Sequence, residues 1–199
     1  MRSRTLLVLL GAAVLALALG GCIFFPDDDV IQPPAPKYLA PISPENVIKN
    51  LETLYISRDF TQYDSVLAAG YIFRFQPADI TAGAPDSLIR VEEMNFAENL
   101  FQRGGPDGAP PASRIGLVIT KTGSGPDPRF GHAGWLRYNV STNLTITFSD
   151  GNAMAVVSPA LFYFVQEPAG SGMWRLAEWA DQPSGKPELL EVRREYTVR

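Results

Sequence analysis

Few side chains in this sequence could carry out nucleophilic, acid–base or metal chemistry. The chain of 199 residues contains one histidine, His132, and one cysteine, Cys22. A zinc site built from histidine and cysteine needs three or four such ligands, and a Ser-His-Asp site would have to use His132. His132 stands between glycines in the run Arg129–Gly134, so we expect an exposed loop histidine. We therefore expect no metal site and no cofactor.

Acidic residues are the remaining candidates for catalysis. An isomerase-like site needs a carboxylate base in an apolar pocket, together with a donor such as tyrosine. Asp79, Asp86, Glu92 and Glu93 lie in or next to expected loops and helix ends. Acids at such positions are usually solvated, so we expect these four on the surface and assign no catalytic residue.

The amino-terminal segment gives the single cysteine a role. Arg2 and Arg4 precede the apolar run Leu6–Leu19, which is shorter than the roughly 20 residues of a membrane-spanning helix. A positive start, a short apolar run and small residues before a cleavage site are typical of a secretory signal. The sequence Leu19-Gly20-Gly21-Cys22 resembles the bacterial lipobox, in which lipid is attached to the cysteine.

This resemblance implies a processed and anchored protein. Residues 1–21 would be removed, and Cys22 would become the lipid-modified first residue of the mature chain. Several acyl chains together hold a protein stably on a membrane. Ile23 stands where an aspartate retains enteric lipoproteins in the inner membrane. We therefore expect a protein of the bacterial cell envelope, in the outer membrane (periplasmic side or surface) if the host has two membranes.

Composition separates a tether from a folded domain. Five prolines and an acidic triplet in residues 22–43 predict an extended, solvated linker after the lipid. Residues 44–182 carry the patterned segments of one domain, and residues 183–199 read as a charged tail. The formal net charge of -4 lacks the basic excess of nucleic-acid-binding proteins, so no nucleic-acid partner is expected.

Three helices are predicted ahead of the longer strands. Ser43 can cap a helix that begins at Pro44, and Asp59 can cap a second, short one. An aromatic and β-branched strand follows at residues 71–75, and a third helix is expected over residues 88–103.

A long β-hairpin gives the clearest local signal. Residues 135–149 and 152–166 flank Asp150-Gly151, which predicts a two-residue type I′ turn. In that register Tyr138 lies opposite Tyr163 on one apolar face. Strands at residues 114–122 and 173–181 complete the predicted sheet. The tryptophans of this region are expected in the core: Trp135, Trp174 and Trp179.

The order of elements predicts an α+β fold, with three helices on the concave face of a strongly curved, mainly antiparallel sheet. Four segments resemble nuclear transport factor 2-like domains, including bacterial lipoproteins of that superfamily: Asn46–Leu51, Asp59–Tyr63, Tyr71–Phe75 and Trp174–Trp179. Long loops at residues 104–112 and 123–134 depart from the compact form of the family.

The resemblance implies a cone with a cavity between helices and sheet, which we expect Phe73, Phe75, Tyr138 and Tyr163 to line. The superfamily includes isomerases, dehydratases and polyketide cyclases as well as non-catalytic proteins, so the fold does not settle the function. We expect a non-catalytic envelope protein that binds a partner or a small apolar ligand. The alternatives are a cavity enzyme of those types and a purely structural envelope component. A homodimer through the sheet is also implied.

Overall fold

The structure is a computed structural model that describes residues 38–183, 192–193 and 195–197. The predicted signal, the lipid attachment site Cys22 and most of the predicted tether lie outside the described residues. No helix in the described ranges is long and apolar enough to cross a membrane.

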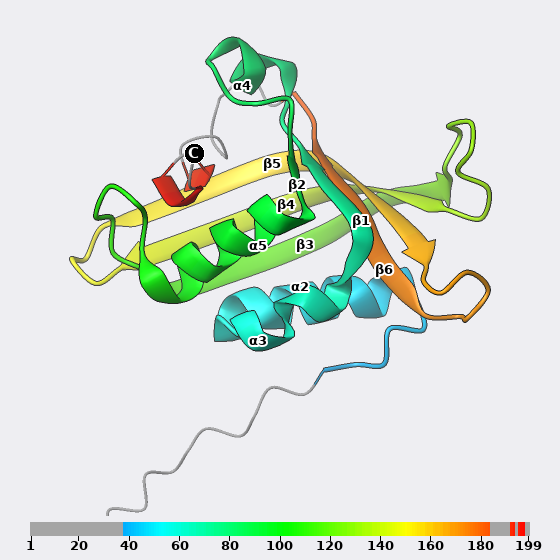
Figure 1. The fold of residues 1–199 in the computed structure, drawn as a ribbon, viewed down its shortest axis with the longest axis horizontal. Helices are drawn as coiled ribbons and strands as arrows, with labels where there is room; N and C mark the ends of the chain where they lie inside the picture. The colour runs from blue at the N-terminus through cyan, green and yellow to red at the C-terminus, as the bar shows by residue number, and fades with distance from the viewer. Residues whose placement is uncertain (1–37, 184–191, 194, 198–199) are drawn as a thin grey trace, which may run out of the picture. The chain divides into compact units, whose positions relative to one another are not determined.

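The described chain begins with helices that alternate with two strands and continues into four further strands of the same sheet (Figure 1). The helices are α2 (Pro44–Ser57), α3 (Phe60–Tyr63), α4 (Pro77–Thr81) and α5 (Arg90–Glu98), with a 3-10 turn at Asp64–Val66 and a π-helical turn at Asn99–Arg103. The strands are β1 (Leu67–Arg74), β2 (Ser87–Ile89), β3 (Ala112–Pro126), β4 (Leu136–Phe148), β5 (Ala153–Gln166) and β6 (Trp174–Asp181). Beyond them, residues 192–193 and 195–196 are helical.

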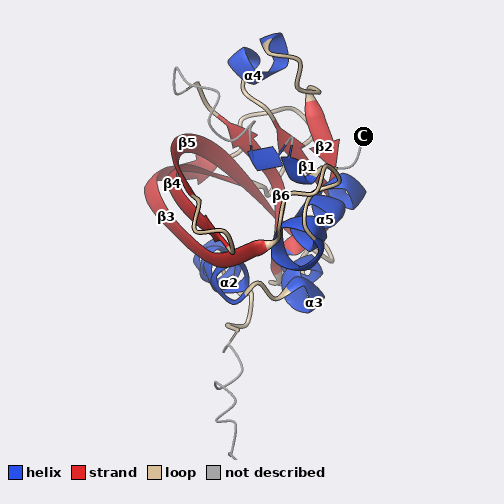
Figure 2. Cartoon of the chain, turned by 90° about the vertical axis from the view of Figure 1, so that its left-hand side faces the viewer, coloured by secondary structure: helices blue, strands red, loops and turns tan. Residues whose placement is uncertain are grey.

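The strands form one mixed sheet in the order β2-β1-β6-β5-β4-β3. Strands β1 and β6 pair in parallel, and all other neighbours pair antiparallel. Figure 2 shows β3, β4 and β5 curling strongly, with α2 and α5 on the open side of the curl. We call the face that packs on these helices the inner face, and the opposite one the outer face. The predicted α+β class is confirmed.

The first two helices begin where their capping residues predict. Ser43 Oγ accepts a hydrogen bond from the Asn46 amide at 3.2 Å, and Asp59 Oδ1 accepts one from the Gln62 amide at 3.2 Å. Each bond satisfies an amide that the first helical turn leaves free. Glu52 then ties α2 to the sheet, because its carboxylate accepts a hydrogen bond from the Ile119 amide of β3 at 2.7 Å.

The third predicted helix is shorter than expected. Residues 87–89 form the edge strand β2, and the regular helix α5 begins only at Arg90. The Glu92 carboxylate accepts a hydrogen bond from the Ile89 amide at 2.8 Å and so fixes this start. The helix α4, at residues 77–81, was not predicted; it follows Gln76 and has Pro77 at its first position.

The hairpin of β4 and β5 differs from the predicted register by one residue. The structure pairs Thr147 with Ala153 and Tyr138 with Phe162. The connection is a three-residue loop, Ser149–Gly151, whose last residue has a φ of 88° that favours glycine. Because side chains alternate between faces, one residue of shift moves Tyr163 to the outer face while Tyr138 stays on the inner face.

The core lies between the inner face of the sheet and the helices. It is rich in aromatic residues, which pack edge-on or tilted: Tyr55, Tyr63, Phe101, Phe73, Phe75, Phe162, Phe164 and Trp179. Residues from the expected charged tail also enter it, since Val192, Arg193 and Tyr196 are almost completely buried.

Two aspartate substitutions test the hairpin register. Val156 is 3% exposed on the inner face, whereas its neighbour Val157 is 56% exposed on the outer face. Val156→Asp should lower the free energy of unfolding by about 3 kcal/mol, because it buries an unpaired carboxylate. Val157→Asp should lower it by about 1 kcal/mol or less. Urea unfolding of both variants measures the difference, and the reverse order would indicate the two-residue turn.

Candidate functional site

A buried ion pair occupies the space between the helices and the sheet. Arg193 is 2% exposed, and Glu93 on α5 is fully buried. The Arg193 Nη1 donates to Glu93 Oε2 at 2.5 Å, and Nη2 lies 3.4 Å from Glu93 Oε1. The guanidinium also stacks on aromatic rings, since its carbon lies 3.4 Å from the ring centre of Phe73 and 4.5 Å from that of Phe96.

Tyrosines complete the surroundings of this pair. The Tyr63 hydroxyl donates to Glu93 Oε1 at 2.8 Å and lies 3.4 Å from the hydroxyl of Tyr55. Burial, followed by the nearby charge of Glu93, raises the pKa of Tyr63 and of Tyr71 well above the ordinary value. These tyrosines therefore stay protonated, and Glu93 has both of its oxygens engaged by donors.

The second buried acid, Asp181, sits at the end of β6. Its Oδ1 accepts a hydrogen bond from Trp179 Nε1 at 2.9 Å, and its Oδ2 has no hydrogen-bond partner among the described residues. Burial raises the pKa of Asp181 to about 7, although Arg193 and the Trp179 hydrogen bond both oppose this shift. Asp181 is thus a carboxyl that can hold or release a proton near neutral pH.

The structure separates the four residues that were expected to line a cavity. Phe73 and Phe75 lie together on the inner side with their ring centres 5.0 Å apart, and Phe73 packs against Arg193. Tyr138 is also on the inner face, where its hydroxyl donates to Glu45 Oε1 at 2.8 Å. Tyr163 is on the outer face, because Tyr138 pairs with Phe162 and not with Tyr163 as predicted.

Two of the four acids expected on the surface are buried. Asp79 and Glu93 are fully buried, whereas Asp86 is exposed and Glu92 caps α5. Helical spacing could have identified Glu93, because it precedes the buried residues Phe96, Ala97 and Leu100 by three, four and seven positions.

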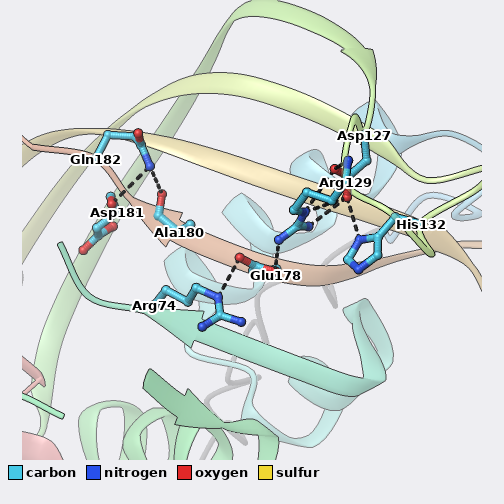
Figure 3. Close-up of polar contacts among 8 residues, drawn as sticks. All are labelled: Arg74, Asp127, Arg129, His132, Glu178, Ala180, Asp181 and Gln182. Atoms are coloured by element: carbon cyan, nitrogen blue, oxygen red, sulfur yellow. Dashed lines mark hydrogen bonds and ion pairs between the residues drawn. The ribbon is translucent and has the colours of Figure 1, made fainter. Parts of the chain in front are cut away.

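A second polar cluster lies on the outer face, where the loop between β3 and β4 folds over β5 and β6 (Figure 3). Arg129 joins two acids: Nη2 lies 2.8 Å from Asp127 Oδ2, and Nη1 lies 2.8 Å from Glu178 Oε2. Its guanidinium carbon is 3.7 Å from the ring centre of Tyr163. Arg74 donates from Nε to the other Glu178 oxygen at 2.9 Å.

His132 belongs to this outer cluster and is partly buried, whereas an exposed loop histidine was expected. Its Nδ1 lies 2.7 Å from Asp127 Oδ2, and its ring centre is 4.3 Å from that of Trp135. Burial opposes the ionisation of Asp127, but hydrogen bonds from Arg129 and His132 outweigh it and lower the pKa of Asp127 to about 2. The acids of the cluster are thus committed to cations and hold the loop on the sheet.

A groove runs beside this cluster. It has a volume of about 510 Å³, and Trp135, Val165, Pro168, Ala169 and Ala177 are among its mainly apolar lining residues. A smaller hollow of about 270 Å³ shares Trp135, Val165 and Ala169 with it. Trp135 and Trp174, both expected in the core, are only partly buried, and of the three tryptophans Trp179 alone is a core residue.

Metal ligands do not gather at either cluster. Within the described part of the chain, no group of three or more histidine, cysteine, aspartate or glutamate side chains is placed to hold a metal ion.

Comparison with solved structures identifies the fold. A conserved protein from Planctomyces limnophilus matches with a TM-score of 0.53 and 14% identity, over 68% of this chain and 89% of that one. A protein from Kribbella flavida matches with a TM-score of 0.53 and 15% identity, over 78% of this chain and 95% of that one. A protein of unknown function from Mycobacterium tuberculosis matches with a TM-score of 0.51 and 11% identity, over 78% of this chain and 89% of that one. No protein-family model and no curated protein match the sequence.

These identities show the fold alone, which is the nuclear transport factor 2-like α+β fold. The function of this chain depends on its own residues, because one fold can host catalytic and non-catalytic proteins.

The buried pair of Glu93 and Arg193 should contribute strongly to the free energy of unfolding. Arg193→Met should lower the free energy of unfolding by about 3–5 kcal/mol, because it leaves the Glu93 carboxylate buried without its cation. Adding Glu93→Gln should recover part of this loss, since the amide carries no charge and can still accept from Tyr63.

Arg74→Met is the matched control. The Arg74 side chain is 48% exposed, so losing its ion pair with Glu178 should cost about 1 kcal/mol or less. Urea unfolding of the variants measures these differences. Equal losses for Arg193→Met and Arg74→Met would contradict the central place given to the buried pair.

Proposed function

We propose that this protein is a lipid-anchored protein of the bacterial cell envelope that binds a small apolar ligand without catalysing its conversion. Cys22 is the proposed lipid attachment site. The groove beside Trp135 on the outer face is the proposed binding site. In a host with two membranes, we place the anchor in the outer membrane, because Ile23 follows the cysteine.

The position of Arg193 carries the non-catalytic part of this proposal. A cavity enzyme of this fold would need room for substrate between the helices and the inner face of the sheet. Here Arg193 fills that region, with its guanidinium against Phe73 and Phe96 and its charge neutralised by Glu93. Both oxygens of the Glu93 carboxylate already accept hydrogen bonds, from the guanidinium and from the Tyr63 hydroxyl, so Glu93 is engaged in holding the interior together.

The groove beside Trp135 has the size and lining of a small-molecule site. Its volume of about 510 Å³ falls within the range of about 300–1,000 Å³ that ligand pockets occupy. Gln166 and Glu167 are the polar residues of its lining. Glu167 is engaged, because its Oε2 accepts a hydrogen bond from the Ala69 amide at 3.0 Å. The remaining surface favours an apolar ligand that stacks on the indole ring.

A second candidate function is a cavity enzyme of the isomerase, dehydratase or cyclase type. The observation that favours it is Asp181, a buried carboxyl whose pKa is raised to about 7. Asp181 could act as the general base of such an enzyme. This function would require Arg193 to leave the interior and admit a substrate, so the closed structure favours binding on the outer face.

The anchor is tested by substituting the cysteine. Cys22→Ser should abolish the incorporation of radiolabelled palmitate and leave the signal uncleaved, because the acceptor thiol is lost. Phe25→Ser keeps that thiol and should be labelled and processed like the wild type. Gel autoradiography of the three chains reads the result, and palmitate labelling that persists in Cys22→Ser refutes the anchor.

The groove is tested with N-phenyl-1-naphthylamine, a neutral apolar probe whose fluorescence rises in apolar surroundings. The wild-type protein should bind it saturably. Trp135→Ala should weaken binding about tenfold, because it removes an aromatic contact worth about 1.5 kcal/mol. Val157→Ala alters an exposed residue of the outer face that does not line the groove, and should bind like the wild type. Equal affinities for the two folded variants would exclude the groove.

A further inference from the structure

The loop between β3 and β4 has an unusual distribution of polarity. Its charged side chains turn toward the sheet, where Asp127 and Arg129 pair with each other and Arg129 pairs with Glu178. The exposed positions from the last residue of β3 through the loop are all uncharged: Pro126, Pro128, Phe130, Gly131, Ala133 and Gly134. Phe130 is fully exposed and has no cover from the described residues. A solvated loop normally has the opposite arrangement.

Two more segments at the same end of the sheet share this character. Strand pairing brings the ends of β4 and β5 together through Leu136 and Phe164, and the Trp174 amide at the start of β6 donates to the Pro41 carbonyl at 2.7 Å. The turn from β5 to β6 exposes only Pro168, Ala169, Gly170 and Ser171, and the segment before α2 exposes only Leu39, Ala40 and Ile42. Figure 1 shows these three segments on the right-hand side.

The opposite end of the sheet is charged. Its loops, on the left-hand side of Figure 1, expose Arg103 and Asp107 after α5 and Asp150 in the hairpin. The uncharged end is therefore a property of one end of the domain, not of its loops in general. Exposed apolar surface of this kind marks a contact with an apolar partner.

We infer that this uncharged end of the domain lies in the interface of the lipid bilayer, with Phe130 and its neighbours among the headgroups. The inference rests on the proposed lipid anchor at Cys22. The described chain starts at Tyr38, within the uncharged end itself, so the proposed attachment site Cys22 is joined to the domain at this end. Aromatic and apolar side chains at such depth, about 5–10 Å into the interface, are typical of peripheral membrane contacts.

The membrane contact expected for this end does not depend on anionic lipid. A polybasic surface binds through anionic lipids, whereas in the segments at 38–42, 126–135 and 167–173 the only lysine or arginine side chain is Arg129, which is 34% exposed and paired with Asp127 and Glu178. Contact should therefore form equally well on vesicles of pure phosphatidylcholine and on vesicles that contain phosphatidylglycerol. A contact that appears only on the anionic vesicles would overturn the inference.

Site-directed spin labelling of the mature, lipidated protein in phosphatidylcholine vesicles tests the contact directly. In the proposed anchor the Cys22 sulfur is a thioether, so Phe130→Cys, Ala169→Cys and Asp150→Cys each provide one free thiol. Labels at positions 130 and 169 should collide several-fold more often with oxygen, which enters the bilayer, than with a water-soluble nickel chelate. The label at position 150, on the charged end, should show the reverse preference.

The outcomes separate this inference from the proposed anchor. If the wild-type chain takes up the label at Cys22, the anchor is refuted and the inference with it. If the wild type stays unlabelled and positions 130 and 169 prefer the nickel chelate as position 150 does, the anchor stands and the bilayer contact is wrong. Dipolar broadening between labels at position 130 that vanishes on dilution with unlabelled protein would instead identify a second copy as the partner, and would also overturn the inference.

Discussion

The pairing of Glu93 with Arg193 is the constraint on which the interior of this domain depends. A charge buried in an aromatic core is tolerated only when it is paired and hydrogen-bonded, and each of these two groups supplies what the other lacks. Glu93 also accepts from Tyr63, and Arg193 lies flat on Phe73. Through these contacts the pair links α5, the end of α3, strand β1 and the described residues after the sheet.

The polar groups inside the domain and those on its outer face form two separate clusters. With Arg193 in place, the buried polar groups Glu93, Tyr63 and Arg193 bind to one another. The outer cluster of Asp127, Arg129 and Glu178 has a related role, because it holds a long loop against the sheet and thereby forms one side of the groove at Trp135. Charge in this protein mainly fixes polypeptide segments in place.

The sequence predicts the elements well where one residue decides them locally. Ser43 and Asp59 start helices as expected, and the inner positions of β4 alternate as predicted. Strand β5 was placed one residue out of register because both of its faces carry large apolar residues, such as Leu161 and Phe162, so its pattern fits either register. The length of the connecting turn therefore sets the register. The sequence Asp150-Gly151 is compatible both with a two-residue turn and with the three-residue loop that forms.

The sites were harder to predict because they depend on contacts distant in the sequence. Glu93 shows its burial through helical spacing, but its partner lies 100 residues further along the chain. No local pattern marks Arg193, which stands in a segment with the composition of a tail. The contact of Arg129 with Glu178 likewise joins residues 49 positions apart.

The late position of Arg193 in the chain has a consequence for how the protein matures. Glu93, Tyr63 and the six strands all precede it, so the Glu93 carboxylate lacks its cation until Arg193 reaches its place against Phe73. Gly105 packs closely against this segment, since a Cβ at that position would lie 2.2 Å from the Glu195 carbonyl oxygen. Contacts of such long sequence separation form slowly. The core should therefore reach its final packing only after Arg193 and Tyr196 have joined it.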